Sequence, residues 1–266
     1  MGADAMTHMD GRSIAGEVDL TGRVALITGA AGGLGRRFAH TLAGRGAAVA
    51  VADVRTEQLT TVQEELERGG ARSVATFLDL TATDSFADVV TRVEAELGPV
   101  DVLINNAGIN DANRPQRLTL DTISRVIATN LEGPFALTCE VAKRLIERKQ
   151  PGRIVNMSSI NAFSYSHSTA SPVYSITKAA VVRMTEVLAI EWAKYDINVN
   201  AIAPGLFMTE MTAGMIERVG DPSEAFPRKR IGRPDQLDST ILYLLSPASD
   251  CVTGTVIKID DGQKPR

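Results

Sequence analysis

The fold of this chain is decided near its N-terminus by the stretch Arg23-Val24-Ala25-Leu26-Ile27-Thr28-Gly29-Ala30-Ala31-Gly32-Gly33-Leu34-Gly35. Its short apolar run is typical of a strand buried on both faces. The glycines that follow permit positive φ angles and let the backbone approach a ligand closely. A helix that begins after such a turn directs free N–H groups at a diphosphate. Glycines also serve loops that only need a tight turn, but strand, turn and helix in this order favour dinucleotide binding.

The rest of the chain continues this alternation of strand and helix. Six further strands are predicted over residues 47–53, 74–80, 100–105, 153–157, 197–202 and 255–259. Helical spacing lies between them over residues 38–43, 56–68, 83–97, 121–149, 173–194 and 235–245. Apolar strands separated by amphipathic helices indicate a parallel sheet covered on both faces, with ligands at the carboxyl ends of its strands. We therefore predict an α/β, doubly wound, seven-stranded parallel sheet in a single domain over residues 21–266, after an N-terminal tail over 1–20.

The composition excludes several classes of function. The net charge is −4 without a basic stripe, which argues against a nucleic-acid partner. No run approaches the roughly 20 apolar residues of a membrane helix, so no membrane partner is expected. The three histidines, His8, His40 and His167, lack metal-ligand spacing, and no metal is predicted. Cys139 and Cys251 lie far apart and form no disulfide framework, which favours a cytoplasmic location.

Asp53 ends the second predicted strand, 18 residues after Gly35. An acid near this spacing accepts a hydrogen bond from the adenosine ribose 2′-hydroxyl and repels a 2′-phosphate. NAD is therefore predicted over NADP, although a solvated strand-end aspartate is the simpler alternative. Arg36, Arg37 and Arg55 lie nearby in the sequence and leave NADP possible.

Tyr174 and Lys178 lie four residues apart at the start of a predicted helix. Positions i and i+4 share one face of a helix, so the phenol and the ammonium point the same way. The positive charge favours phenolate and is expected to lower the Tyr174 pKa from about 10. Such a tyrosine is able to act as an acid or a base near neutral pH. The pair alone is a weak signal, because this spacing is common on helices.

Five motifs stand in one order along the chain. They are Thr28-Gly29-x-x-x-Gly33-x-Gly35, Asn105-Asn106-Ala107-Gly108, Thr129-Asn130-Leu131, Ser158-Ser159 followed by Tyr174-x-x-x-Lys178, and Pro204-Gly205. Together they resemble the short-chain dehydrogenase/reductase family over about residues 20–263. The resemblance implies a Rossmann-like fold and NAD(P)-linked oxidation of an alcohol or reduction of a ketone, often in a homotetramer.

The resemblance also implies roles for the catalytic candidates. Tyr174 would take or give the proton of the substrate oxygen as general acid/base. Lys178 would hold the nicotinamide ribose and lower the Tyr174 pKa. Ser159 would hydrogen-bond the substrate oxygen, with Ser158 as the alternative. Asn130 would use its amide to hold a water that links Lys178 to solvent.

A further set of residues resembles the family's cofactor contacts, with ordinary strand-end chemistry as the alternative for each. They are Gly29, Gly33, Leu34 and Gly35 for the phosphates, Asp53, Asp79 and Leu80 for the adenosine, Asn106 and Gly108 behind the ribose, and Ile202, Pro204, Gly205 and Thr209 beside the nicotinamide, together with Tyr174 and Lys178.

Three segments concern the substrate or depart from the family pattern. Ser159 lies 15 residues before Tyr174, about two more than is common in the family, so the loop over 161–172 is expected to edge the substrate pocket. Residues 207–231 carry several methionines and prolines and are interpreted as a lid with an apolar lining. Asp260-Asp261-Gly262 replaces the family's usual single aspartate and two glycines, a change expected to affect assembly.

The sequence thus predicts an NAD-dependent oxidoreductase that acts on a small-molecule secondary alcohol or ketone. The alternatives are an NADPH-dependent ketoreductase, such as a 3-oxoacyl-thioester reductase, and a sugar or polyol dehydrogenase. A non-catalytic dinucleotide-binding protein is the alternative of a different class. It would keep the glycine-rich turn and lose the Ser-Tyr-Lys set, whereas this chain has both.

Overall fold

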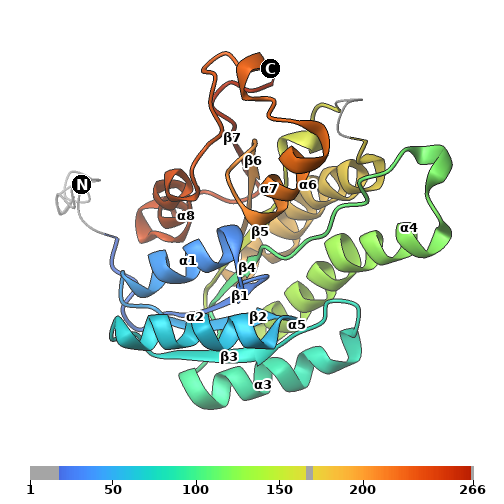
Figure 1. The fold of residues 1–266 in the computed structure, drawn as a ribbon. Helices are drawn as coiled ribbons and strands as arrows, with labels where there is room; N and C mark the ends of the chain where they lie inside the picture. The colour runs from blue at the N-terminus through green and yellow to red at the C-terminus, as the bar shows by residue number, and fades with distance from the viewer. Residues whose placement is uncertain (1–17, 166–169, 265–266) are drawn as a thin grey trace, which may run out of the picture.

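Seven parallel strands form the centre of the protein (Figure 1). The computed structural model describes residues 18–165 and 170–264. The strands are β1 (Val24–Thr28), β2 (Ala48–Asp53), β3 (Ser73–Phe77), β4 (Val102–Asn105), β5 (Gly152–Met157), β6 (Ile197–Pro204) and β7 (Val256–Ile259). Their order in the sheet is β3-β2-β1-β4-β5-β6-β7, and every neighbouring pair is parallel. The predicted seven-stranded parallel sheet is confirmed. The predicted tail lies outside the described residues up to residue 17.

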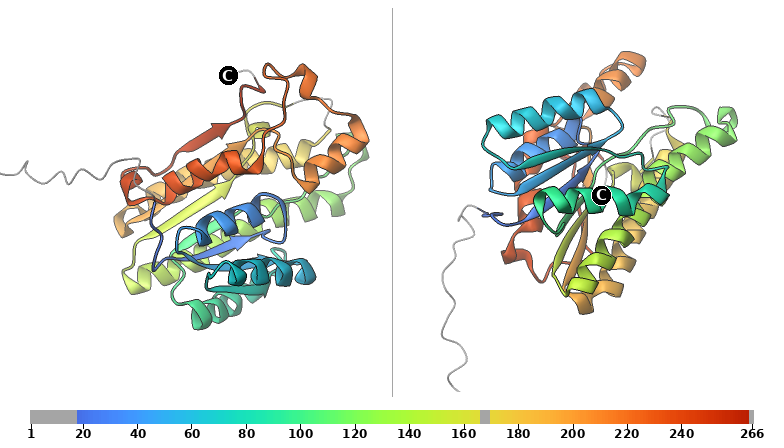
Figure 2. Two further views of the ribbon diagram at one scale, coloured as in Figure 1. Left: turned by 60° about the vertical axis from the view of Figure 1, so that its left-hand side comes forward. Right: turned by 90° about the horizontal axis from the view of Figure 1, so that it is seen from below.

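Helices cover both faces of this sheet, as predicted (Figures 1 and 2). They are α1 (Gly33–Ala43), α2 (Thr56–Arg68), α3 (Phe86–Leu97), α4 (Leu120–Ile127), α5 (Gly133–Arg148), α6 (Pro172–Trp192), α7 (Glu210–Val219) and α8 (Asp238–Leu245). Among the described residues, no helix is both long enough and apolar enough to cross a membrane.

Alternating side chains of each strand enter two separate core layers, because successive residues of a strand face opposite sides of the sheet. Ile27 of β1 packs in the layer that contains Phe38 of α1. Its neighbour Leu26 packs in the opposite layer, which contains Leu137 of α5. Both layers are mainly apolar, so the central strands are mainly apolar as well, and this is the pattern visible in the sequence. β5 and β6 also carry buried polar residues, among them Asn156 and Asn200.

The order of the strands places a switch point beside β1. This strand pairs with β2 on one side and with β4 on the other. The sheet therefore extends from β1 in one direction through β2 and β3, and in the opposite direction through β4 to β7. Open parallel sheets bind ligands at the carboxyl ends of the strands where the order reverses. The carboxyl ends concerned are Thr28 of β1 and Asn105 of β4, which lead directly into the glycine-rich turn and into Asn106.

β3 ends at Phe77, although the apolar pattern predicted a strand as far as residue 80. Leu78 and Leu80 are buried, which explains the pattern. Between them, the Asp79 carboxylate accepts hydrogen bonds from the N–H and the hydroxyl of Thr81 at 2.9 and 2.8 Å. This local turn ends the extended backbone that continues from β3.

The helix predicted over 121–149 is divided. A π-helical segment, Ala128–Glu132, joins α4 to α5 and contains Asn130. Pro134 has no N–H to donate to the carbonyl group of Asn130 four residues earlier, so the regular α-helical ladder is interrupted there. Gly133 packs on the segment that follows β3, since a Cβ on this residue would overlap the carbonyl oxygen of Leu80.

Two helical glycines make this packing testable. In Gly133→Ala, the added methyl group meets the Leu80 backbone, so we expect the free energy of unfolding to fall by about 1–3 kcal/mol. In Gly214→Ala, nothing lies within 4 Å of the added methyl group in α7, so we expect a gain of about 0.5–1 kcal/mol from helix propensity. Urea denaturation of both variants measures the difference, and equal effects would contradict the close packing at Gly133.

Candidate active site

A cleft of about 1200 Å³ lies at the carboxyl ends of the strands. It is lined by most of the residues that the sequence singled out: Gly29, Gly33, Leu34, Asp53, Asp79, Leu80, Asn106, Gly108, Ser158, Ser159, Tyr174, Lys178, Pro204, Gly205 and Thr209. Gly35, Asn130 and the fully buried Ile202 are not among the residues that line it. The structure therefore gathers residues from distant parts of the sequence around one space and assigns these three a place behind it.

Three glycines of the first turn, Gly29, Gly33 and Gly35, meet two requirements, a positive φ angle and close packing. Gly29 and Gly33 adopt positive φ angles of +66° and +53°, which favour glycine. A Cβ on Gly29 would also lie 2.7 Å from the Cα of Ala107. A Cβ on Gly35 would overlap the carbonyl oxygen of Gly29. Gly35 therefore lets α1 pack against the turn from behind, instead of facing the cleft as the phosphate-contact prediction requires.

The N-terminus of α1 fits a diphosphate group. Gly32 provides no side-chain cap, and the first turn of the helix contains no acidic residue. Its first N–H groups have no partner within the helix, and they open toward the cleft at Gly33 and Leu34. Free N–H groups and the positive end of the helix dipole together bind anions.

The side chain of Asp53 is held at the end of β2 and is 8% exposed. One carboxylate oxygen accepts a hydrogen bond from the Ala31 N–H at 3.2 Å, and the other accepts one from the Arg55 N–H at 3.0 Å. The guanidinium of Arg55 pairs with Glu210 at the start of α7, at 2.9 Å. Sequence reasoning missed Glu210 because it lies 155 residues from its partner.

Asn106 fixes the glycine-rich turn from the neighbouring strand. Its side-chain amide donates hydrogen bonds to the carbonyl groups of Thr28 and Gly29, at 3.0 and 3.1 Å. In return, the Thr28 hydroxyl accepts hydrogen bonds from the N–H groups of Asn106 and Ala107, both at 3.1 Å. Reciprocal hydrogen bonds therefore fix the carboxyl end of β1 to the segment that follows β4.

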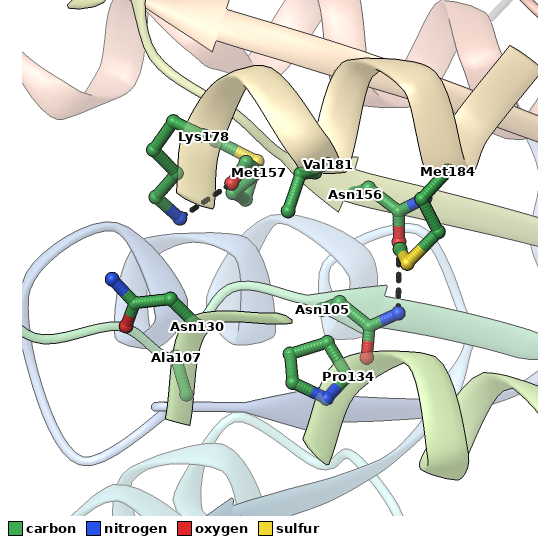
Figure 3. Close-up of a pocket in the computed structure, with 9 residues that line it drawn as sticks. All are labelled: Asn105, Ala107, Asn130, Pro134, Asn156, Met157, Lys178, Val181 and Met184. Carbon is green, nitrogen blue, oxygen red and sulfur yellow. Dashed lines mark hydrogen bonds between the residues drawn. The ribbon is translucent and has the colours of Figure 1, made fainter. Parts of the chain in front are cut away.

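Tyr174 and Lys178 lie one turn apart on α6, and the Lys178 Nζ is 5.6 Å from the centre of the tyrosine ring. Lys178 is 4% exposed and donates a hydrogen bond to the carbonyl group of Met157 at 2.7 Å (Figure 3). The Ser158 hydroxyl donates to the carbonyl group of Lys178 at 2.8 Å, whereas the Ser159 side chain is hydrogen-bonded to Tyr174. Of the two serines, only Ser159 contacts the phenol.

Burial controls the protonation of both groups. It lowers the pKa of Lys178 from 10.5 to about 8, because the charged amine has lost its hydration. Burial raises the pKa of Tyr174 above its ordinary value, and the hydrogen bond from Ser159 only partly opposes this. The expectation that Lys178 lowers the Tyr174 pKa is therefore wrong for this structure, since loss of solvent around the phenol outweighs other effects.

Asn130 holds the loop that follows β4. Its Oδ1 accepts a hydrogen bond from the Ile109 N–H and its Nδ2 donates to the Ile109 carbonyl, both at 2.8 Å. The second N–H of the amide lies 3.3 Å from the Thr177 hydroxyl. Both hydrogens are thus committed to protein atoms. The role expected of this amide, to hold a water that links Lys178 to solvent, stays a prediction. A Cβ on Gly108 would lie 3.4 Å from both Asn130 Oδ1 and Lys178 Nζ, so the two side chains converge on that glycine.

Lys178 and Asn130 also border a small, tightly packed space that both polar and apolar side chains line (Figure 3). The Asn105 amide donates to Asn156 at 2.8 Å and to Thr138 at 2.7 Å, which links β4, β5 and α5. In the described part of the chain, the Asn105 Oδ1 is buried without a hydrogen-bond partner. The buried amides thus join these elements beside the space that Lys178 lines.

The two predicted pocket segments contribute to the cleft at several points. Asn161 and Ser171 of the 161–172 loop line it, while His167 lies outside the described residues. From residues 207–231, the cleft is lined by Phe207, Thr209, Glu210, Met211, Thr212, Met215, Arg218, Pro222, Ala225 and Phe226. The unusual Asp261 pairs with Arg228 and Arg230 at 3.0 and 2.6 Å. It therefore ties the C-terminal segment to residues 207–231.

The sequence model of the short chain dehydrogenase family matches residues 23–219, which is most of the chain. The chain belongs to the short-chain dehydrogenase/reductase family. It is an oxidoreductase that acts on CH–OH groups, like its relatives. The resemblance stated from the five motifs is confirmed, and so is the nucleotide-linked oxidoreductase activity that it implies.

Curated relatives span nearly the whole chain. It is 33% identical to 2-dehydro-3-deoxy-D-gluconate 5-dehydrogenase of Formosa agariphila, over 92% of this chain and 93% of the relative. It is 34% identical to 5-keto-D-gluconate 5-reductase of Escherichia coli, over 91% and 96%. It is 36% identical to a 3-oxoacyl-acyl-carrier-protein reductase of Thermotoga maritima, over 91% and 98%.

Solved structures agree with the fold. A short-chain dehydrogenase/reductase from Mycobacterium marinum superimposes with a TM-score of 0.90 at 32% identity, covering 93% of this chain and 98% of the other. The actinorhodin polyketide ketoreductase, solved with NADPH, gives a TM-score of 0.86 at 31% identity, over 91% and 97%.

The depressed pKa of Lys178 makes stability depend on pH. Between pH 8 and 10.5 the unfolded chain keeps this proton while the folded protein releases it, so stability rises with pH, by about 3 kcal/mol over the whole window. Wild type and Lys178→Met are compared by urea denaturation across this range. We expect the wild type to gain stability relative to the variant as the pH rises, and parallel profiles would contradict the burial of the amine.

Proposed function

We propose that the protein transfers a hydride between NAD(H) and a secondary alcohol or ketone, with Tyr174 as the general acid/base. The observation that carries this proposal is the convergence of Tyr174, Ser159 and Lys178 on the same cleft as the uncapped N-terminus of α1. A bound nicotinamide cofactor would supply or accept the hydride. The protein must orient the substrate and move one proton.

The side chains divide this work. Tyr174 takes the proton of the alcohol in oxidation and gives it back in reduction. With substrate bound, Ser159 would turn its one hydroxyl hydrogen from the phenol to the substrate oxygen and stabilise the charge that develops there. Lys178 holds the nicotinamide ribose. Asn130 positions the loop after β4 and, as the family resemblance implies, would hold a water that links Lys178 to solvent.

The cofactor contacts follow the cleft. Gly29, Gly33 and Leu34 would face the diphosphate, Asp53, Asp79 and Leu80 the adenosine, Asn106 and Gly108 the adjoining ribose, and Pro204, Gly205 and Thr209 the nicotinamide. Their common position on the cleft wall supports these roles. Gly35 contributes by letting the turn close.

A hydroxy or oxo acid of a sugar is the substrate class we favour. Several relatives are named for gluconate derivatives. Arg218 and Lys264 line the cleft, and neither forms an ion pair with another described residue, so both are available to a carboxylate. The alternative is a 3-oxoacyl thioester, which a reductase among the relatives uses by name. The apolar lining from Met211, Met215 and Phe226 supports it.

We propose a cytoplasmic homotetramer. Exposed apolar side chains on α5 and α6, Phe135, Ile176 and Ile190, support burial of these helices between subunits. The free thiols of Cys139 and Cys251 fit a reducing compartment. We expect light scattering after gel filtration to give the mass of four chains, and a monomer would contradict the tetramer. We expect cell fractionation to place the protein in the cytosol, and a periplasmic protein would contradict that location.

Replacing the phenol tests the mechanism directly. In Tyr174→Phe, we expect kcat for NADH formation from a panel of sugar acids and secondary alcohols to fall by about 10²–10⁴-fold, because the proton has no acceptor. Tyr243→Phe is the control, since Tyr243 is exposed on α8 and does not line the cleft. Wild-type turnover by Tyr174→Phe would contradict the proposed role.

Cofactor choice tests the role of Asp53. We expect a higher kcat/KM with NAD than with NADP, because the carboxylate repels a 2′-phosphate. Asp53→Ser should lower the NAD/NADP ratio by about tenfold or more, which corresponds to about 1.4 kcal/mol. Asp84→Ser, at an exposed position away from the cleft, should leave the ratio unchanged. A wild-type preference for NADP would contradict this assignment.

A further inference from the structure

The N-terminus of α6 is capped from a distant part of the chain. Ser171 gives this helix no side-chain cap, and Pro172 occupies its first turn. The first N–H groups of a helix need acceptors from outside the helix. The N–H groups of Val173 and Tyr174 donate to the two carboxylate oxygens of Asp111, at 3.0 and 3.2 Å. Both oxygens of one carboxylate thus accept hydrogen bonds from the backbone of Tyr174, the proposed acid/base residue, and of its neighbour Val173.

Asp111 belongs to a short segment, residues 108–112, that we call the strap. At one end, the Asn130 side chain forms hydrogen bonds with both the N–H and the carbonyl group of Ile109. At the other end, Ala112 adopts a positive φ of +44°, and its N–H donates to the Asn110 side chain at 3.0 Å. The strap therefore turns back at Ala112 and presents Asp111 to α6.

The strap touches every part of the proposed catalytic set except Ser159. Gly108 lies against Lys178 and Asn130, since a Cβ there would be 3.4 Å from each. Gly108, Ile109 and Asn110 also line the cleft. The segment that lines the cleft is thus the same one that is fixed to the start of α6 through a single carboxylate.

We propose that Asp111 is a positioning residue for the reaction, an inference that rests on the proposed function. Its carboxylate fixes the backbone of Tyr174 relative to the strap, and this sets the place of the phenol between Ser159 and the substrate. Asp111 itself exchanges no proton with the substrate. A displacement of about 1 Å at a reacting group is enough to lower a rate by about 100-fold. Loss of the carboxylate therefore acts on kcat, while the distant adenosine and diphosphate contacts continue to hold the cofactor.

Two variants and a matched control separate positioning from general stability. Asp111→Ala removes both acceptors, Asp111→Asn keeps one acceptor oxygen, and Thr119→Ala removes the side-chain cap of α4, which accepts from Thr122. We expect kcat to fall about 10- to 100-fold in Asp111→Ala with the KM for NAD nearly unchanged, and to be partly restored in Asp111→Asn. Thr119→Ala should lower the melting temperature without lowering kcat. Wild-type kcat in Asp111→Ala, or equal losses of kcat in Asp111→Ala and Thr119→Ala, would overturn the proposal.

Amide hydrogen exchange provides a readout that needs no substrate. The Val173 and Tyr174 amides should exchange faster in Asp111→Ala than in wild type, and at least one should do so in Asp111→Asn. If Asp111→Ala does not fold, Asp111→Asn provides the test. Unchanged exchange protection of both amides together with an unchanged kcat in this variant would overturn the positioning role of Asp111. Absence of wild-type turnover with every alcohol and ketone would refute the proposed function, whereas the exchange result would still report on the cap.

Discussion

The hydrogen bond from the buried Lys178 amine to the carbonyl group of Met157 is the interaction on which the site depends. An amine that is 4% exposed is costly to bury unless protein acceptors replace its water. The last residue of β5 supplies one, and Ser158 returns a hydrogen bond to the Lys178 carbonyl. α6 is thereby tied to the end of β5 at two points. This connection places Tyr174 within hydrogen-bond reach of Ser159 and leaves Lys178 at the wall of the cleft.

The neighbouring strands extend the same principle. Asn105 and Asn156 link β4 to β5, and Asn106 links the end of β4 to the glycine-rich turn after β1. Each link satisfies a buried polar group, so the polar network both stabilises the sheet edge and orients the loops that line the cleft. The π-helical segment contributes because it turns the Asn130 amide onto the loop after β4. Binding surface and catalytic residues are therefore positioned by one set of contacts.

Much of this was predictable from the sequence because it depends on local pattern. Strands buried on both faces are mainly apolar, so their number and parallel arrangement were visible. The spacing of Tyr174 and Lys178 identified one face of a helix. Contacts between distant residues were not visible: Glu210 on Arg55 and Asp111 on α6 depend on loops whose course no local pattern fixes. The pKa of Tyr174 was predicted in the wrong direction because the sequence shows a neighbouring charge but not the loss of water around the phenol.

The central claim is that burial sets the protonation of Tyr174 beside Lys178 and that this tyrosine moves the proton. Spectrophotometric titration of phenolate, as the difference between wild type and Tyr174→Phe, measures this group alone, with and without NAD. Without cofactor, the account predicts that Tyr174 titrates above its ordinary pKa of 10.0, and that the positively charged nicotinamide ring of bound NAD then lowers this pKa. A Tyr174 pKa below 10.0 without cofactor, or one that NAD leaves unchanged, would contradict it.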